Sequence, residues 1–233
     1  MIEFIRSALS MGVKFHCLKS ISLFKNKINE SEWNQLETEA KHLWKEYLKS
    51  IDLELYQEFH KMYQEEQNSK RSPIYKLVVY SNFNKIKDIV ESSGFPGEDL
   101  IGLDNQTLAK SISDCECENS KIIVTLLHYD YPIIEIGEEK LISEVENGNL
   151  HPRDFALIYN FERNKISVLY KESNKRYDSL PKYDFNLPFG NNITDIEKVN
   201  SDREKFGICK YVVDKKKIEI SQKYGMKLEF GYR

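Results

Sequence analysis

The chain has 233 residues, of which 40% are hydrophobic and 30% are charged, with 14 Tyr and 12 Phe. This length and composition allow a substantial buried core, which excludes an intrinsically disordered chain and predicts one main folded domain. The 34 basic and 37 acidic side chains leave a formal net charge of -3, so no strong overall field exists to attract nucleic acid or an anionic membrane.

The amino-terminal segment, residues 1–18, mixes apolar side chains with Glu3, Arg6, Lys14 and His16. It therefore lacks the uninterrupted apolar core of a signal peptide. No stretch of the sequence approaches the roughly 18 apolar residues that a membrane span needs. We expect a cytoplasmic protein that makes no contact with a membrane.

The cysteines are too few for a disulfide framework in a chain of this length. They are Cys17, Cys115, Cys117 and Cys209. Cys115 and Cys117 are separated by one residue, whereas zinc knuckles use two or more, and no second pair completes a tetrahedral site. We expect free thiols, with no metal ion and no cofactor.

Residues 29–67 contain neither Pro nor Gly, and their apolar side chains recur at steps of three and four residues. This pattern predicts amphipathic helices, with Asn29 and Glu32 capping the start and a second helix beginning near residues 50–52. Such an apolar stripe is typical of a buried core or of a partner interface. Its members are Trp33, Leu36, Ala40, Leu43, Trp44, Tyr47, Leu48 and Ile51.

The helical pattern breaks at Pro73, after which Ser81 or Asn82 is predicted to cap a short helix that Gly94 closes. Residues 95–97 then form a turn.

Further helices are predicted over residues 104–112, 119–128 and 138–146. Pro152 fits the first position of another helix, with Asp154 in the favourable first turn.

In the carboxyl-terminal part, polar and apolar side chains alternate with a period of two residues. Residues 217–220 and 227–230 alternate polar and apolar side chains on either side of Tyr224-Gly225, which predicts a β-hairpin, and residues 166–170 fit another strand. The expected fold is therefore mainly α, an irregular multi-helix domain with a small C-terminal β-hairpin or short antiparallel sheet.

These predicted elements divide the chain into three parts. Residues 1–70 form an N-terminal helical segment that packs on the main domain, residues 71–210 form the helical core domain, and residues 211–233 form the hairpin. The long N-terminal helices also offer an interface for a protein partner or a second copy of the chain.

Standard catalytic motifs are absent from the sequence: there is no glycine-rich phosphate loop, no His-Glu-x-x-His helix and no Gly-x-Ser-x-Gly elbow. The strongest remaining candidate is His128-Tyr129-Asp130, at the end of a predicted helix. Residues two apart point to opposite sides of a helix, so His128 and Asp130 line one pocket only if the helix loosens before Pro132.

Two interpretations of this triplet stay open. In the first, His128 acts as a general base that Asp130 orients, or both hold a metal ion with Glu135 or Asp154. In the second, His128 only stabilises the carboxyl-terminal end of its helix, where the helix dipole is negative, and Asp130 caps the next turn.

Several segments are similar, in order and spacing, to an uncharacterised bacterial domain family. Its members carry a Gln-x-x-Arg segment, a Gly-Trp-Pro turn, a Gln-His-x-Asp motif and a later helix that ends in Asp-Arg. The corresponding segments here are residues 62–71, 89–96, 101–102, 127–130 and 150–159. The resemblance extends over about residues 55–208 and implies a domain of unknown function.

This chain departs from the family pattern at important positions. Leu127 replaces the glutamine, and Asn160-Phe161 replaces the Asp-Arg pair. The polar residues Gln67 and Arg71 are kept, and as residues four apart they are expected on one helical face, where Arg71 pairs with Asp130 or holds an anion.

We therefore expect an intracellular binding or protein-interaction protein, with a polar pocket near His128 and Asp130. The alternative is a small hydrolase or transferase in which His128 is the general base and Asp130 orients it. In either case the expected ligand-binding residues are Gln67, Arg71, Tyr129 and Asp154, and no nucleic acid is expected as a partner.

Overall fold

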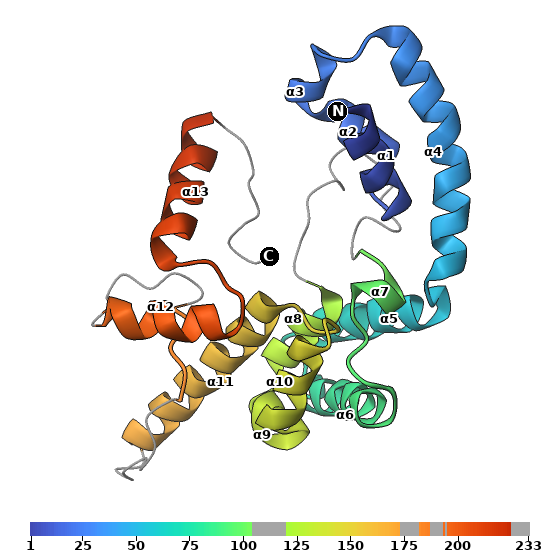
Figure 1. Ribbon diagram of the computed structural model, residues 1–233. Helices are drawn as coiled ribbons and strands as arrows, with labels where there is room; N and C mark the ends of the chain where they lie inside the picture. Colours follow the sequence, from blue (N-terminus) through green and yellow to red (C-terminus); the bar gives the residue numbers. More distant parts are fainter. Residues whose placement is uncertain (104–119, 173–181, 187–192, 194, 225–233) are drawn as a thin grey trace. The chain divides into compact units, whose positions relative to one another are not determined.

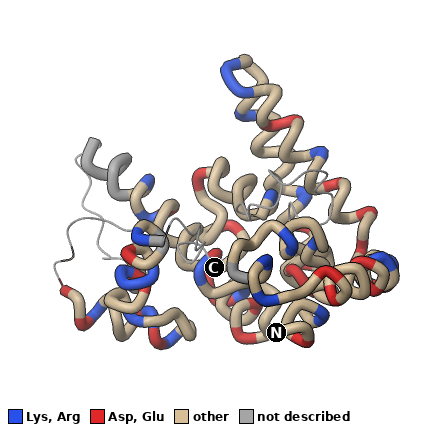
Figure 2. Tube along the Cα trace, turned by 90° about the horizontal axis from the view of Figure 1, so that it is seen from above, with Lys and Arg blue, Asp and Glu red and all other residues tan. Residues whose placement is uncertain are grey.

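The protein is described by a computed structural model that covers residues 1–103, 120–172, 182–186, 193 and 195–224. In these ranges every regular element is a helix and no strand occurs (Figure 1), which confirms a mainly helical fold. Both signs of charge are distributed along the described helices (Figure 2). None of these helices is long and apolar enough to cross a membrane.

Two segments that were predicted as strands are helical. Residues 166–170 belong to α11 (Pro152–Glu172), and residues 217–220 belong to α13 (Tyr211–Tyr224). The predicted hairpin is therefore wrong in its first half, and residues 227–230 lie outside the described residues. A four-residue alternation was misleading because Ile166 continues a three- and four-residue spacing of buried side chains along α11.

The chain divides into two compact units. Unit 1 comprises residues 1–68 and 96–122, and unit 2 comprises residues 69–95 and 123–233. The helices of unit 1 are α1 (Ile2–Ser10), α2 (Phe15–Ser20), α3 (Ser22–Lys25), α4 (Glu30–Ser50), α5 (Leu53–Ser69, whose last residue is in unit 2) and α7 (Glu98–Ile101).

Helix α4 supports the core of unit 1. It begins with the predicted capping box, in which Asn29 and Glu32 each accept the other's backbone N–H, and α1 and α2 pack against it. Trp33, Leu36 and Ala40 of the predicted apolar stripe belong to this core, and Leu43 packs against it, which accounts for part of the stripe without a partner. The core consists of Ile5, Ala8, Leu9, Leu18, Phe24, Ile28, Trp33, Leu36 and Ala40.

The cysteines differ from the expectation of free thiols at one position. Cys17 takes part in a disulfide, so the expectation was wrong there, whereas Cys209 is a free thiol. Cys115 and Cys117, like the helix predicted over residues 104–112, lie outside the described residues.

Unit 2 contains the remaining helices. They are α6 (Tyr75–Ser93), α8 (Lys121–His128, which starts in unit 1), α9 (Pro132–Ile136), α10 (Glu138–Glu146), α11, α12 (Ile196–Lys205) and α13. Helix α6 starts six residues earlier than Ser81, the predicted cap, but ends as predicted at Gly94. The short α9 packs against α6, α10 and α11, and α12 packs against α13.

Aromatic side chains fill unit 2 next to α11. The Phe155 ring lies 5.2 Å from Phe206 and 6.1 Å from Phe185, and the Tyr159 ring lies 5.6 Å from Tyr183. These contacts connect α11 to α12 and to residues 183–185, so the cluster holds the carboxyl-terminal elements on α11.

Tyr47 of α4 is enclosed by two glycines of unit 1. Its hydroxyl accepts a hydrogen bond of 2.8 Å from the N–H of Leu103. Gly12 and Gly102 have φ values of +93° and +76°, and a Cβ on either would lie 2.2 Å or 2.1 Å from a Tyr47 atom. Both positions therefore require glycine for backbone conformation and for space.

We predict that Gly102→Ala lowers the free energy of unfolding by about 2 kcal/mol or more, because strain and a clash with Tyr47 add together. Gly148→Ala is the matched control, since Gly148 also has a positive φ of +81° but nothing within 4 Å of its added Cβ. It should cost about 1 kcal/mol. Urea unfolding of both variants measures the difference, and equal losses would contradict the packing of Tyr47.

Candidate functional site

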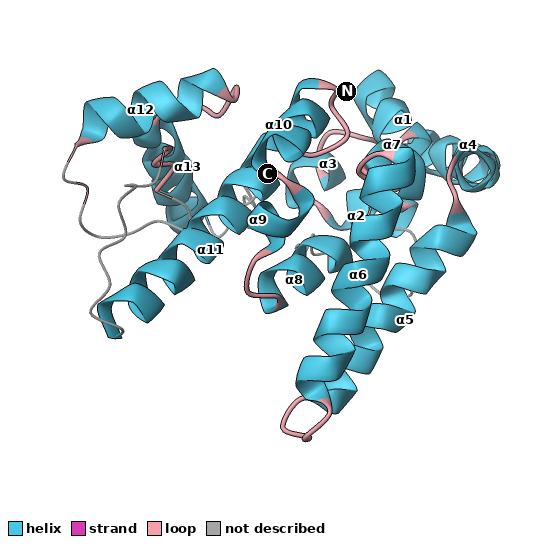
Figure 3. Ribbon diagram, turned by 90° about the horizontal axis from the view of Figure 1, so that it is seen from below, coloured by secondary structure: helices cyan, strands magenta, loops and turns pink. Residues whose placement is uncertain are grey.

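A three-residue turn, Tyr129 to Tyr131, joins α8 to α9. Helix α8 ends at His128, and Pro132 occupies the first position of α9, where the missing N–H of proline is not needed. In Figure 3 this turn lies between α6 and α11. The chain therefore leaves the helix at His128, which is the condition for His128 and Asp130 to line one pocket.

Lys165 of α11 holds this turn in place. Its ammonium group donates to the carbonyls of Tyr129, at 3.2 Å, and Leu127, at 3.4 Å. It also forms an ion pair of 3.0 Å with the carboxylate of Asp130. Because one cation satisfies two carbonyls and a carboxylate, the backbone of the turn has little freedom.

Glu162, one turn before Lys165, fixes the start of α9. Its buried carboxylate accepts hydrogen bonds from the N–H groups of Ile133, at 2.6 Å, and Ile134, at 3.4 Å. Burial raises the pKa of Glu162, and these two bonds partly offset the rise. The carboxylate thus satisfies amides that a helix start leaves without partners.

Tyr129 is an anchor inside the turn. Its ring stacks on Phe83 of α6 with a centroid distance of 3.8 Å, and its hydroxyl donates to Glu135. Burial, followed by the bond to Glu135, raises the pKa of Tyr129 above its ordinary value. The phenol is therefore neutral at physiological pH and committed to an internal contact.

The other predicted site residues are placed as follows. The half-buried ring of His128 lies edge-on to Tyr75, 6.3 Å away, and Asp154 is buried in the first turn of α11. Gln67 lies within α5, but Arg71 is exposed beyond the end of that helix with a φ of +70°. The expected common helical face of Gln67 and Arg71 is therefore wrong, because α5 ends at Ser69.

Asp130 has a different partner from the one expected. Its ion pair within the described residues is with Lys165, not with Arg71. The structure therefore brings Tyr129 and Asp130 together as parts of one supported turn. The catalytic roles of His128 and Asp130 stay predictions.

Exposed apolar side chains flank this turn and form what we call the apolar surface: Leu77, Tyr80, Tyr131, Ile134 and Phe161. Leu77 and Tyr80 on α6 are 68% and 53% exposed, and Ile134 on α9 is 56% exposed. The Tyr80 ring lies 6.3 Å from that of Tyr129. Apolar groups this exposed on neighbouring helices are typical of an interaction site.

Phe161 joins the apolar surface through Lys165. The ammonium group of Lys165 lies 4.6 Å from the centroid of the Phe161 ring, and the same group binds Asp130, the residue before Tyr131. The aromatic ring of α11 is thereby next to the turn. The apolar surface thus extends from α6 across α9 to α11.

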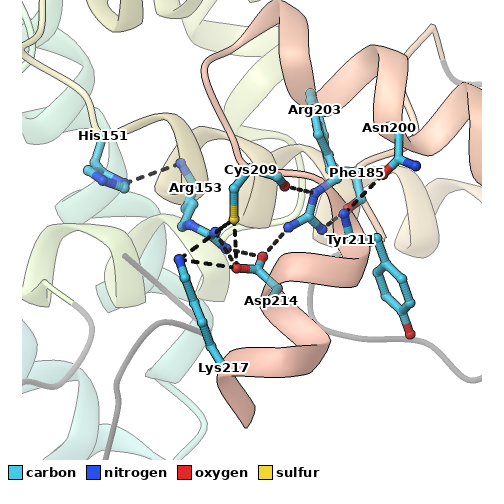
Figure 4. Close-up of polar contacts among 9 residues, drawn as sticks. All are labelled: His151, Arg153, Phe185, Asn200, Arg203, Cys209, Tyr211, Asp214 and Lys217. Carbon is cyan, nitrogen blue, oxygen red and sulfur yellow. Dashed lines mark hydrogen bonds and ion pairs between the residues drawn. The ribbon is translucent and has the colours of Figure 1, made fainter. Parts of the chain in front are cut away.

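A second polar cluster, which the sequence did not reveal, lies at the carboxyl-terminal end of unit 2 (Figure 4). Both oxygens of Asp214 accept hydrogen bonds of 2.7 Å from the guanidinium group of Arg153, and Arg203 also donates to this carboxylate. Arg203 further donates to the carbonyls of Phe185, at 3.1 Å, and Cys209, at 2.8 Å.

The cluster is buried, and its two guanidinium groups share one carboxylate. Burial alone would raise the pKa of Asp214, but hydrogen bonds from Arg153 and Cys209 and the charges of Arg153 and Arg203 hold it below its usual value. Asp214 was overlooked because residues 211–233 were predicted to form a β-hairpin. If a helix had been predicted here, Asp214 would have stood out as an acidic residue in its first turn, where negative charge is favourable.

Comparisons of the chain with models of protein families, with curated proteins and with solved structures found no match. The resemblance to the uncharacterised bacterial family stays a prediction. Within the described residues, no three His, Cys, Asp or Glu side chains come together in a way that could hold a metal ion.

We predict that Asp214→Asn lowers the free energy of unfolding at pH 7 by about 3 kcal/mol, because two buried guanidinium groups lose their counter-charge. The stabilisation is complete above the usual Asp pKa of 3.8 and is lost as the pH falls through the lower pKa of the folded state. The difference between the two proteins should therefore narrow in acid.

Urea unfolding at a series of pH values measures this effect. The control is Asp88→Asn, since Asp88 is exposed on α6 and its loss should change the free energy of unfolding by less than about 0.5 kcal/mol. A difference between Asp214→Asn and the unsubstituted protein that does not depend on pH would show that the carboxylate is not the source of the stabilisation.

Proposed function

We propose that the chain is a helical binding protein that docks a protein partner through the apolar surface. The observation that carries this proposal is the exposure of Leu77, Tyr80 and Ile134 on two packed helices, each more than half accessible. Burying such side chains against a partner supplies binding free energy of about 25 cal/mol for each Å² of apolar area.

The charges near α6 favour a partner segment that carries acidic residues. Residues 67–87 include five basic side chains and no acidic one, and Arg71 and Lys76 are exposed close to Leu77 in the sequence. Cations at the edge of an apolar surface accelerate the encounter with an acidic partner and select against a basic one.

The polar residues of the turn support binding better than catalysis. Asp130 is engaged by Lys165, and the hydroxyl of Tyr129 by Glu135, so both serve to keep the turn rigid. A rigid surface loses little conformational entropy when a partner docks. The alternative of a hydrolase with His128 as general base stays a prediction.

Photo-crosslinking tests this proposal. The protein is expressed in its native host with a photo-crosslinking amino acid in place of Tyr80. We expect a discrete crosslinked adduct that Leu77→Asp reduces at least tenfold, as estimated for loss of a central apolar contact that costs about 1.4 kcal/mol or more. An added mass of 27.5 kDa, the mass of one chain, would identify a second copy as the partner.

Phe4→Asp is the matched control, because Phe4 of unit 1 is also 68% exposed. It should leave the adduct unchanged, and circular dichroism should show both variants folded. The proposal fails if the Tyr80 position gives no discrete adduct, or if Leu77→Asp and Phe4→Asp reduce it equally.

A further inference from the structure

Unit 1 contains a cavity of about 280 Å³ between α4 and the connection from α1 to α2. Leu9 and Ala40 line it and are buried. Small-molecule sites usually measure about 300–1,000 Å³, so this volume suits a ligand at the small end of that range.

Two aromatic side chains, Phe15 and Trp44, also line the cavity, and both are supported from behind. The Phe15 ring meets Trp33 of the core edge-on at 5.7 Å. The Trp44 ring lies 5.4 Å from Tyr47, which the backbone of unit 1 encloses. Because their neighbours are fixed, these two rings form a cavity that exists before any ligand binds.

Basic side chains predominate among the polar residues that line the cavity. Lys14, Lys41 and His16 line it together with one carboxylate, Glu37. The ammonium group of Lys14 lies 4.3 Å from the centroid of Trp44. Lys41 is exposed, and no ion pair within the described residues neutralises it.

We propose that this cavity binds a small aromatic monocarboxylate, with its ring beside Phe15 and Trp44 and its carboxylate at Lys14 and Lys41. The site lies in unit 1, does not depend on the apolar surface of unit 2, and adds a small-molecule ligand to the proposed partner binding.

The environment of Lys14 agrees with an anionic ligand. Burial lowers the pKa of this ammonium group, since partial removal from water disfavours its charge. A carboxylate next to it would restore the lost stabilisation of the charge. An apolar ligand without a charged group would gain nothing from Lys14.

Isothermal titration calorimetry with 3-phenylpropanoate, and with 3-phenylpropan-1-ol as its neutral counterpart, tests the site. We expect the carboxylate to bind at least about tenfold more tightly than the alcohol, because a charge-assisted hydrogen bond is stronger than a neutral one. Lys14→Met keeps the length of the side chain and should weaken carboxylate binding about tenfold.

Lys45→Met is the control for loss of a lysine, because Lys45 is exposed on α4 one residue after Trp44 and does not line the cavity. It should leave the affinity unchanged. Ala40→Leu fills the cavity and should weaken both ligands at least about tenfold, as expected when the occupied volume is lost. Thermal unfolding must show that each variant is folded.

Three results would overturn the proposal: no heat of binding at millimolar ligand, equal affinities for the acid and the alcohol, or equal effects of Lys14→Met and Lys45→Met. Octanoate tests whether the ligand must be aromatic, because it carries an aliphatic chain in place of the ring. If octanoate binds as tightly as 3-phenylpropanoate, the aromatic requirement is wrong. None of these outcomes bears on crosslinking at Tyr80, so the two proposals fail separately.

Discussion

The carboxylate of Asp214 binds two buried guanidinium groups from other helices, and the arrangement of unit 2 depends on it. Arg153 belongs to the first turn of α11, and Arg203 to the last turn of α12. Two buried cations without an anion would be costly, and the single carboxylate that both guanidinium groups share offsets part of that cost where the three helices meet. The same α11 carries Glu162 and Lys165, and the turn before α9 is therefore positioned by a helix that Asp214 holds at its start.

The two proposed recognition sites, one in each unit, are supported by the same means. In unit 2, internal hydrogen bonds to Lys165 and Glu162 fix the backbone that carries the apolar surface. In unit 1, Tyr47 is held by the Leu103 amide and supports the aromatic wall of the cavity. In both cases many of the side chains proposed to contact a ligand or partner are ordinary apolar groups. What distinguishes them is that internal contacts hold their neighbours, which reduces the entropy lost on binding.

Local signals in the sequence were sufficient for some helix boundaries but not for the start of α6. The capping box of Asn29 and Glu32, and Pro152 at the start of α11, were predicted because each acts within one helical turn. The carboxyl-terminal segment was mistaken because four alternating residues do not distinguish a strand from one turn of a helix. The pairing in the Asp214 cluster could not be predicted from local signals, since it joins Arg153 to a residue 61 positions away. Pairing over that distance is decided by packing, which leaves no periodic pattern.

Phe161, Glu162 and Lys165 occupy little more than one turn of α11, yet they face three different surroundings. Phe161 meets solvent, Glu162 is buried against the start of α9, and Lys165 reaches the turn beside it. Inserting one residue between Glu162 and Lys165 would rotate the second by about 100° and separate functions that the helix now keeps in phase. Spacing along α11 is therefore constrained by the fold itself, whereas the exposed side chains of Leu77 and Ile134 on the neighbouring helices contribute little to it. Substitutions at those two positions would therefore alter the surface while the supporting helix keeps its register.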